Sequence, residues 1–223
     1  MTDSNSKEIW DKAGGDSLSS RAYALALGAS LSWAVFLVAF GARISFNWSY
    51  GLGLVLFTFI MTIAGIVVFS HSQNPATSWI GVSILSFFMG LSIGPVLSYY
   101  GADVVLNALI LTLAVTIGMS VLGILFPNVI ARFSGALFVG LLVLLIGYFS
   151  TSILSIFGIT ANTGAFDWLA LIIFSLYIWY DWGRAMKLPK TLDNAIDVSG
   201  ALIIDIVNLF LSLLRVFSRS RNN

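Results

Sequence analysis

Two apolar stretches near the end of the chain decide the fold: LIIFSLYIWYD at residues 171–181 and ALIIDIVNLFLSLLR at residues 201–215. Each stretch carries one carboxylate, Asp181 in the first and Asp205 in the second. A charged side chain inside a membrane-spanning segment costs about 2.5–3.5 kcal/mol or more, so it is seldom kept there without a task or a partner. We therefore expect the rest of the protein to house this pair of aspartates.

Only one of the two aspartates has a simple alternative explanation. The polar segment WGRAMKLPKTLDN follows Asp181 at residues 182–194, so Asp181 alone could be a helix-end residue at the membrane surface. Asp205 has apolar sequence on both sides and lacks this explanation. The pair is therefore the best candidate for a functional site.

The composition places the chain in the membrane class. The 223 residues are 58% hydrophobic and 9% charged, whereas soluble domains usually carry about 25% charged residues. The net charge of +1 argues against a nucleic-acid partner. The chain has no cysteine and one histidine, His71, which excludes metal sites built from thiolates or from several histidines. Oxygen is the remaining ligand chemistry.

Seven apolar runs are long enough to cross a bilayer, which takes about 20 residues. The predicted spans are residues 22–42, 50–70, 77–99, 104–126, 134–151, 168–188 and 193–217. Because the runs are continuous and do not alternate, they indicate helices and not a β-barrel. We predict an all-α polytopic membrane protein, a seven-helix bundle forming one domain at residues 22–217. Residues 1–21 form a retained polar tail, residues 218–223 a basic tail, and residues 152–166 a loop or a continuation of the fifth helix.

Small residues recur at steps of three and four in two of the predicted spans. They are Thr58, Thr62 and Gly65 in the second span and Ser83, Ser86, Gly90 and Gly94 in the third. Small residues let helix backbones approach closely in lipid. We interpret both rows as packing faces and not as a substrate path.

The orientation follows from the lysines and arginines of the short loops. With seven crossings, seven of them lie on the side of the N-terminus and four on the other side. We therefore expect a cytoplasmic N-terminus and, in the absence of a retention signal, a bacterial plasma membrane. If the last helix instead entered and returned on the same side, the count would become ten against one. The sequence leaves both arrangements open.

Polar residues of the last span share one helix face. They follow each other at steps of three and four: Asp197, Ala201, Asp205, Asn208, Ser212, Arg215 and Arg219. Such a stripe is expected to face a polar core or a water-filled path. Alternatively, only Asp205 and Asn208 are buried and the others lie near water. On the sixth span, Tyr177 and Arg184 flank Asp181 at steps of four and three, which makes them candidate partners of the pair.

Geometry allows the two aspartates to meet. Measured from the turn near Pro189, Asp205 lies roughly 16 Å along the last helix and Asp181 roughly 10 Å along the helix before it. Two carboxylates in contact share one proton, and their titration belongs to the pair. With one proton the helices are tied together; with none the carboxylates repel or recruit a cation. Oxygen ligands suit Ca²⁺, but two are too few for tight binding, so we expect weak, transient coordination.

Three segments of the sequence resemble a known family. FSLYIWYD at residues 174–181 and DNAIDVSGALIIDIVNLFLSLLRVF at residues 193–217 resemble the C-terminal signature of the Bax inhibitor-1 (transmembrane Bax-inhibitor motif) family, its bacterial members in particular. GLSIGPVLSYY at residues 90–100 is similar to the family's third-helix segment. The resemblance implies seven helices with the last at the centre. It also implies a pH-sensitive calcium leak controlled by paired aspartates, which fall on Asp181 and Asp205.

The chain departs from the family pattern in its second span. Bacterial relatives tend to have an acidic residue within this helix and a basic cluster at its end, whereas residues 50–70 carry no charge and are followed by His71. Arg184 or Arg215 could substitute for an arginine latch, and the sequence assigns neither.

Two other functions remain open. One is a proton-coupled transporter, in which the aspartates carry protons while another solute moves; no inverted repeat is visible to favour it. The other is a non-conducting scaffold with a structural aspartate pair and partner proteins that the sequence does not identify. GLSIG at residues 90–94 matches the G-x-S-x-G motif of serine hydrolases but lies inside an apolar helix. We therefore expect no catalytic residues, no enzyme and no cofactor apart from a transported ion.

Overall fold

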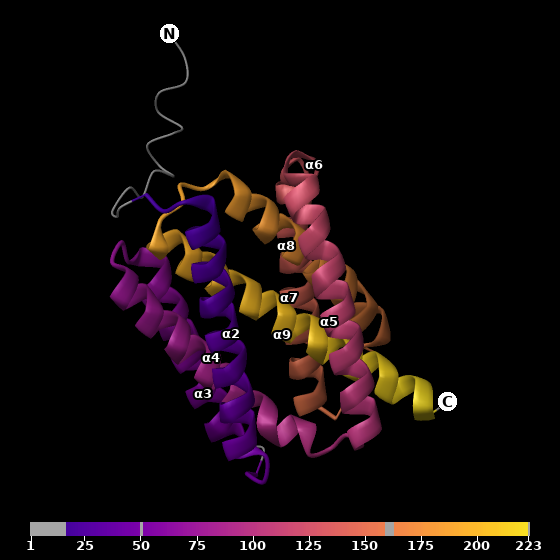
Figure 1. Ribbon diagram of the computed structural model, residues 1–223. Coiled ribbons are helices and arrows are strands. Elements are labelled where there is room, and N and C mark those ends of the chain that lie inside the picture. Colours follow the sequence, from indigo (N-terminus) through magenta and orange to yellow (C-terminus); the bar gives the residue numbers. More distant parts are fainter. Residues whose placement is uncertain (1–16, 50, 159–162, 223) are drawn as a thin grey trace. The chain divides into compact units, whose positions relative to one another are not determined.

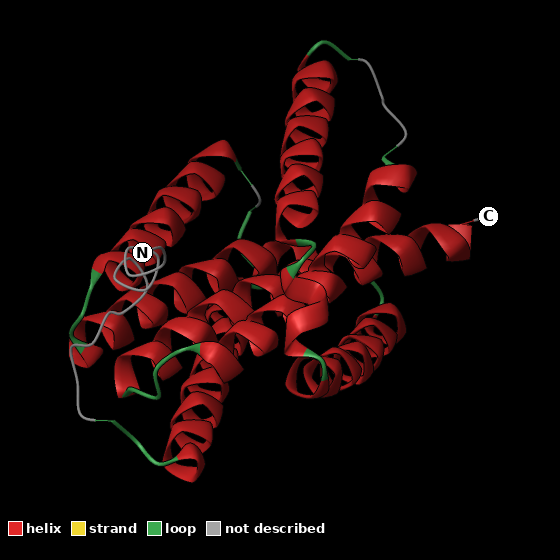
Figure 2. Cartoon of the chain, turned by 90° about the horizontal axis from the view of Figure 1, so that it is seen from above, coloured by secondary structure: helices red, strands yellow, loops and turns green. Residues whose placement is uncertain are grey.

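The computed structural model describes residues 17–49, 51–158 and 163–222 (Figure 1). Within these ranges the chain is helical, without strands (Figure 2). The helices are α2 (Ser20–Ser45), α3 (Leu52–His71), α4 (Pro75–Leu97), α5 (Ala102–Leu125), α6 (Pro127–Ala131), α7 (Ser134–Ile156), α8 (Gly164–Lys187) and α9 (Leu192–Asn222). All of these except α6 have 20 or more residues. The predicted all-α, polytopic membrane fold is confirmed; most of the predicted N-terminal tail lies outside the described residues.

The described helices differ in how clearly they qualify as membrane spans. Six are long and apolar enough to cross a bilayer: α2, α3, α4, α5, the first 18 residues of α7, and α9 as far as Ser220. Helix α8 has the length, but Asp167 and Asp181 lower its apolar character. Its crossing of the membrane, predicted for residues 168–188, stays a prediction.

The chain divides into two compact units. The first contains α2, α3, α4 and residues 187–203; the second contains residues 100–186 and 204–223. Helix α9 contributes to both units, its first residues to one and the rest to the other. The prediction of a single domain stays a prediction.

In the first unit, α4 packs against α2 and α3 through small residues. A methyl group added at Gly90 would collide with the backbone of Val38 on α2, and one added at Gly65 on α3 would collide with the backbone of Leu85. Thr58 and Ser86 are also buried. The predicted packing faces of the second and third spans are confirmed, because only residues without a bulky side chain let these backbones approach so closely.

In the second unit, α8 packs against α7 and α5. Buried apolar side chains from α6, α7 and α8 form one cluster: Ile130, Leu137, Leu144, Ala170 and Ile173. Gly140 on α7 fits against Ile173, and Gly123 on α5 fits against Trp182. These contacts fix the face of α8 that points towards α5 and α7.

Helix α9 is the most buried of the candidate spans. Within the described chain, 56% of its apolar window is buried, compared with 11–22% for α2, α3, α5 and α7. Leu202 and Ile203 belong to the core of the first unit, and Leu209 and Leu213 to that of the second. A helix surrounded in this way can carry polar groups that lipid does not contact.

Candidate proton and ion site

The two predicted aspartates meet in the second unit. Asp181 lies on α8 and Asp205 on α9, and their exposed fractions are 6% and 7%. The two carboxyl groups lie close enough to interact, and they can form a side-chain hydrogen bond when one of them carries a proton. The predicted contact between α8 and α9 at this level is therefore present.

A hydrogen bond between two carboxyl groups requires a proton. An ionised carboxylate is an acceptor only, so one member of the pair must be protonated to donate. Two ionised carboxylates in contact in a low-dielectric environment would repel each other. The arrangement can thus exist as a pair with one shared proton, and losing that proton removes the bond.

Both predicted neighbours lie within electrostatic reach of the pair. Tyr177 is half-buried one turn before Asp181 and interacts electrostatically with Asp205 and Asp181. Arg184 is half-buried and interacts electrostatically with Asp181. Arg184 supplies the positive charge nearest to the pair on α8, which favours the singly ionised state over a fully neutral one.

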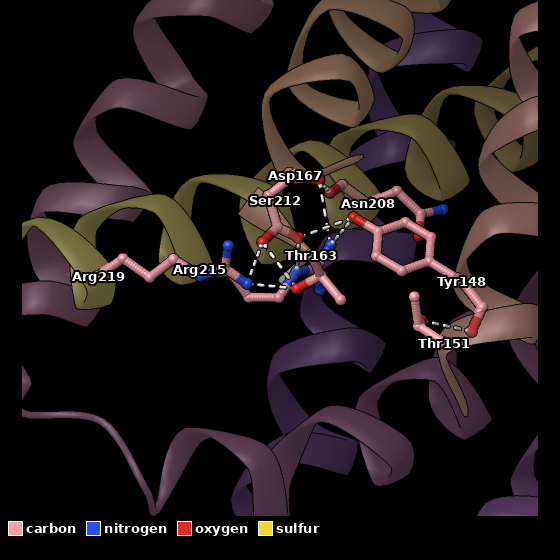
Figure 3. Close-up of polar contacts among 8 residues, drawn as sticks. All are labelled: Tyr148, Thr151, Thr163, Asp167, Asn208, Ser212, Arg215 and Arg219. Carbon is pink, nitrogen blue, oxygen red and sulfur yellow. Dashed lines mark hydrogen bonds and ion pairs between the residues drawn. The ribbon is translucent and has the colours of Figure 1, made fainter. Parts of the chain in front are cut away.

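A second carboxylate cluster lies in the same unit, near the beginning of α8 (Figure 3). Asp167 is fully buried and accepts a 2.6 Å bond from Nε of Arg215 at Oδ1. Nη2 of Arg219 lies 2.9 Å from Oδ2. The hydroxyl of Tyr148 on α7 donates to Oδ1 over 2.8 Å and accepts from Nη2 of Arg215 over 3.0 Å. Thr163 also contacts Asp167 and Arg219.

Sequence reasoning missed Asp167. The sixth span was predicted to begin at Trp168, one residue later, whereas α8 begins at Gly164. A signal was available: Arg215 and Arg219 are one turn apart on the polar face of the last span, where they could pair with an acidic residue. Because Arg215 pairs with Asp167, its described contacts do not make it a latch on the Asp181–Asp205 pair.

The rest of the predicted stripe is only partly continuous. Asn208 donates to the carbonyl of Ile204 over 2.8 Å, and Ser212 donates to the carbonyl of Asn208 over 2.7 Å. Arg215 reaches Ser212 Oγ over 3.4 Å, which links the stripe weakly to the Asp167 cluster. Asp197, predicted on the same face, belongs to the first unit, where it is half-buried.

A fourth buried carboxylate anchors α9 in the first unit. Asp193 accepts a 2.7 Å bond from Ser78 on α4, and both are buried. Thr191 caps the helix by accepting from the backbone of Asn194, whose side chain donates to the carbonyl of Pro189. Sequence reasoning placed Asp193 only as the first residue of the span, because its partner lies 115 residues away.

The described residues contain no group of three or more His, Cys, Asp or Glu side chains able to hold a metal ion. The Asp181–Asp205 pair supplies carboxylate oxygens from two residues only. A cation there would need water or backbone oxygens to complete its coordination, since Ca²⁺ takes six to eight oxygen ligands.

Long apolar helices with carboxylates buried between them define a polytopic helical membrane protein. The chain belongs to the family described as inhibitor of apoptosis-promoting Bax1, whose family model matches residues 20–223. The resemblance seen in the last two helices is thereby confirmed. The chain is also similar to a membrane protein of Vibrio cholerae serotype O1, with 27% identity over 162 residues, 70% of each chain.

Proposed function

We propose that the protein is a pH-sensitive calcium leak channel gated by the Asp181–Asp205 pair. The observation that carries the proposal is the contact between two carboxyl groups, both buried, on two different helices. A purely structural role seldom explains such a pair, because burying two carboxyl groups against each other is costly. Membership in the Bax1 inhibitor family supports the proposal.

The closed state is the state with one shared proton. The hydrogen bond then ties α8 to α9 near the end of α8, while the Asp167–Arg215 bond ties the two helices near its beginning. The two ties are 14 residues apart on α8, or roughly 21 Å along its axis. Because α8 is held to α9 at both levels, the segment of α8 between them cannot move away from α9.

The conducting state is the state without that proton. As pH rises, both carboxylates ionise and repel, whereas the arginine-bound Asp167 keeps its partners. The Asp181 end of α8 then moves while the Asp167 end stays in place. Two adjacent carboxylates without a proton also attract a divalent cation, which passes on because it has too few ligands to stay.

Besides lipid, the partners are protons and calcium ions. We place the protein in a bacterial plasma membrane with its N-terminus in the cytoplasm, on the loop charges described above. In vesicles that contain the protein in both orientations, the measured calcium flux does not depend on which side the N-terminus faces.

The test is calcium flux into proteoliposomes at pH 6 and pH 8, with the wild type, Asp181→Asn, Asp205→Asn and Asp103→Asn. The last variant is the matched control, because it makes the same chemical change at an exposed carboxylate at the start of α5. We expect a higher flux at pH 8 than at pH 6 for the wild type and the control, and no dependence on pH for the two pair variants. Folded protein with no flux at either pH would refute the channel.

A further inference from the structure

A cavity of about 430 Å³ lies in the second unit beside the Asp167 cluster. It is separate from the Asp181–Asp205 pair, and the function proposed above does not use it. The residues that line it, in addition to Asp167, come from the first turn of α8 and the last turns of α9: Gly164, Ala165, Trp168, Val216, Arg219 and Ser220.

The cavity lies at a level where several helices begin or end. Helix α7 ends at Ile156, α8 begins at Gly164, and α9 ends at Asn222. With 31 residues, α9 is roughly 46 Å long, which exceeds a hydrocarbon core of about 30 Å. Its end therefore reaches the headgroup region. Trp168, 58% exposed at the cavity, is a residue type enriched at that level.

Electrostatics at the cavity favour an anion. The guanidinium groups of Arg215 and Arg219 both contact the carboxylate of Asp167. That carboxylate is fully buried and holds a guanidinium at each oxygen, whereas the side chain of Arg219 is 40% exposed and lines the cavity. Gly164 and Ala165 add the positive end of the α8 dipole to the same space.

A tyrosine outside the long helices also interacts with the Asp167 cluster. Tyr100, just before α5, interacts electrostatically with Arg215, Asp167 and Arg219. Burial raises the pKa of its phenol, while Arg215 lowers it. The phenol therefore stays protonated at neutral pH and adds no negative charge against an anion.

We propose that this cavity binds the phosphate headgroup of an anionic phospholipid. Arg219 and the first turn of α8 hold the phosphate, and Trp168 and Val216 contact the glycerol and the upper acyl chain. A phosphate suits this site because a guanidinium and a helix N-terminus are two common ways in which proteins hold it. The same chemistry would accept free phosphate, so the test separates the two sources.

The experiment is native mass spectrometry of the detergent-solubilised full chain, titrated with dioctanoyl-phosphatidylglycerol or dioctanoyl-phosphatidylcholine. The key variant is Ala165→Glu, which puts a carboxylate into the cavity at an exposed first-turn position where helices favour acidic residues. Ala76→Glu, exposed in the first turn of α4, is its matched control. Arg219→Gln removes the guanidinium.

We expect the wild type and Ala76→Glu to bind one phosphatidylglycerol about tenfold more tightly than Ala165→Glu and Arg219→Gln, as for the loss of a charge-assisted contact. Phosphatidylcholine should bind the wild type more weakly than phosphatidylglycerol, and inorganic phosphate should not displace the lipid. Equal affinity of the wild type and Ala165→Glu would overturn the site. Displacement by inorganic phosphate would overturn the lipid as its ligand. Neither result depends on calcium flux.

Discussion

Asp167 and Asp181 are on the same helix, are both buried, and have opposite surroundings. Asp167 is held by two arginines, a tyrosine and a threonine, so its charge is fully compensated. Asp181 faces another carboxyl group, so the contact exists only when a proton is shared. The comparison teaches that the residue type does not decide the role. The residue that α9 presents opposite each aspartate decides whether the contact is an ion pair or a contact between two carboxyl groups that needs a proton.

The difference arises from the spacing on the two helices. Asp205 and Arg215 are ten residues apart on α9, and Asp181 and Asp167 are 14 residues apart on α8. The helices run in opposite directions, so Asp205 lies opposite Asp181, and the long side chain of Arg215 reaches Asp167. Exchanging or removing these partners is the direct way to test the comparison.

The largest effect on stability is expected at Asp167. In Asp167→Asn, two guanidinium groups lose their carboxylate in a partly buried site, which should cost about 3 kcal/mol, at the lower end for breaking a buried ion pair because both arginines retain some exposure. Thermal unfolding in detergent measures the loss. A variant as stable as the wild type would show that the cluster does not hold α8 to α9.

A smaller effect is expected for Arg215→Lys. The ammonium can keep the charge opposite Asp167, but it cannot donate to Asp167 and Tyr148 in the fork geometry of the guanidinium. We expect a loss of about 1.5 kcal/mol in the same unfolding assay. If the lysine variant were as stable as the wild type, the positive charge alone, without the fork geometry of the guanidinium, would account for the contact with Asp167.

Tyr148→Phe sharpens the comparison further. The change removes the hydroxyl that donates to Asp167 but keeps the ring, whose centre lies 5.2 Å from the Arg215 guanidinium carbon. One hydrogen bond contributes about 1 kcal/mol, and the remaining cation–π contact should hold Arg215 in place. Calcium flux should keep its full dependence on pH, because the proton-sharing pair is untouched. Loss of that dependence would contradict the separation of the two sites.

The smallest effect on stability is expected at the pair itself. In Asp181→Asn the amide can donate to Asp205 without any shared proton, so unfolding at pH 6 should change by less than about 0.5 kcal/mol. At pH 8 the variant should be as stable as, or more stable than, the wild type, since the repulsion between two carboxylates is gone. Unfolding midpoints at both pH values give the answer. A large loss at pH 6 would identify the pair as structural.

The positions of the long helices could be predicted closely from the sequence. The third and fourth predicted spans, residues 77–99 and 104–126, correspond to α4 and α5 within two residues at each end. Long apolar runs are unambiguous, because lipid leaves the backbone few alternatives to a helix. The contact between Asp181 and Asp205 was also predictable, because one short turn joins their helices and fixes their relative depth.

The Asp167 cluster was not predictable to the same degree. Asp167 follows a weakly apolar segment, and an acidic residue at the start of a helix is ordinarily explained by the helix dipole. Its partners come from α7 and from the end of α9, 19 and 48 residues away. The contact between Asp193 and Ser78 spans 115 residues and was missed for the same reason. Local patterns reveal a buried charge but not a partner that only tertiary packing supplies.

The central claim is that Asp181 and Asp205 share one proton that is lost as pH rises. Infrared difference spectra of the protein between pH 6 and pH 8 measure it directly, because a protonated carboxylic acid has its own carbonyl stretching band. The account predicts such a band at pH 6 that disappears by pH 8 in the wild type and in Asp103→Asn, and that is missing from the double variant Asp181→Asn with Asp205→Asn. A band of equal size in the double variant, or no band in the wild type at pH 6, would contradict it.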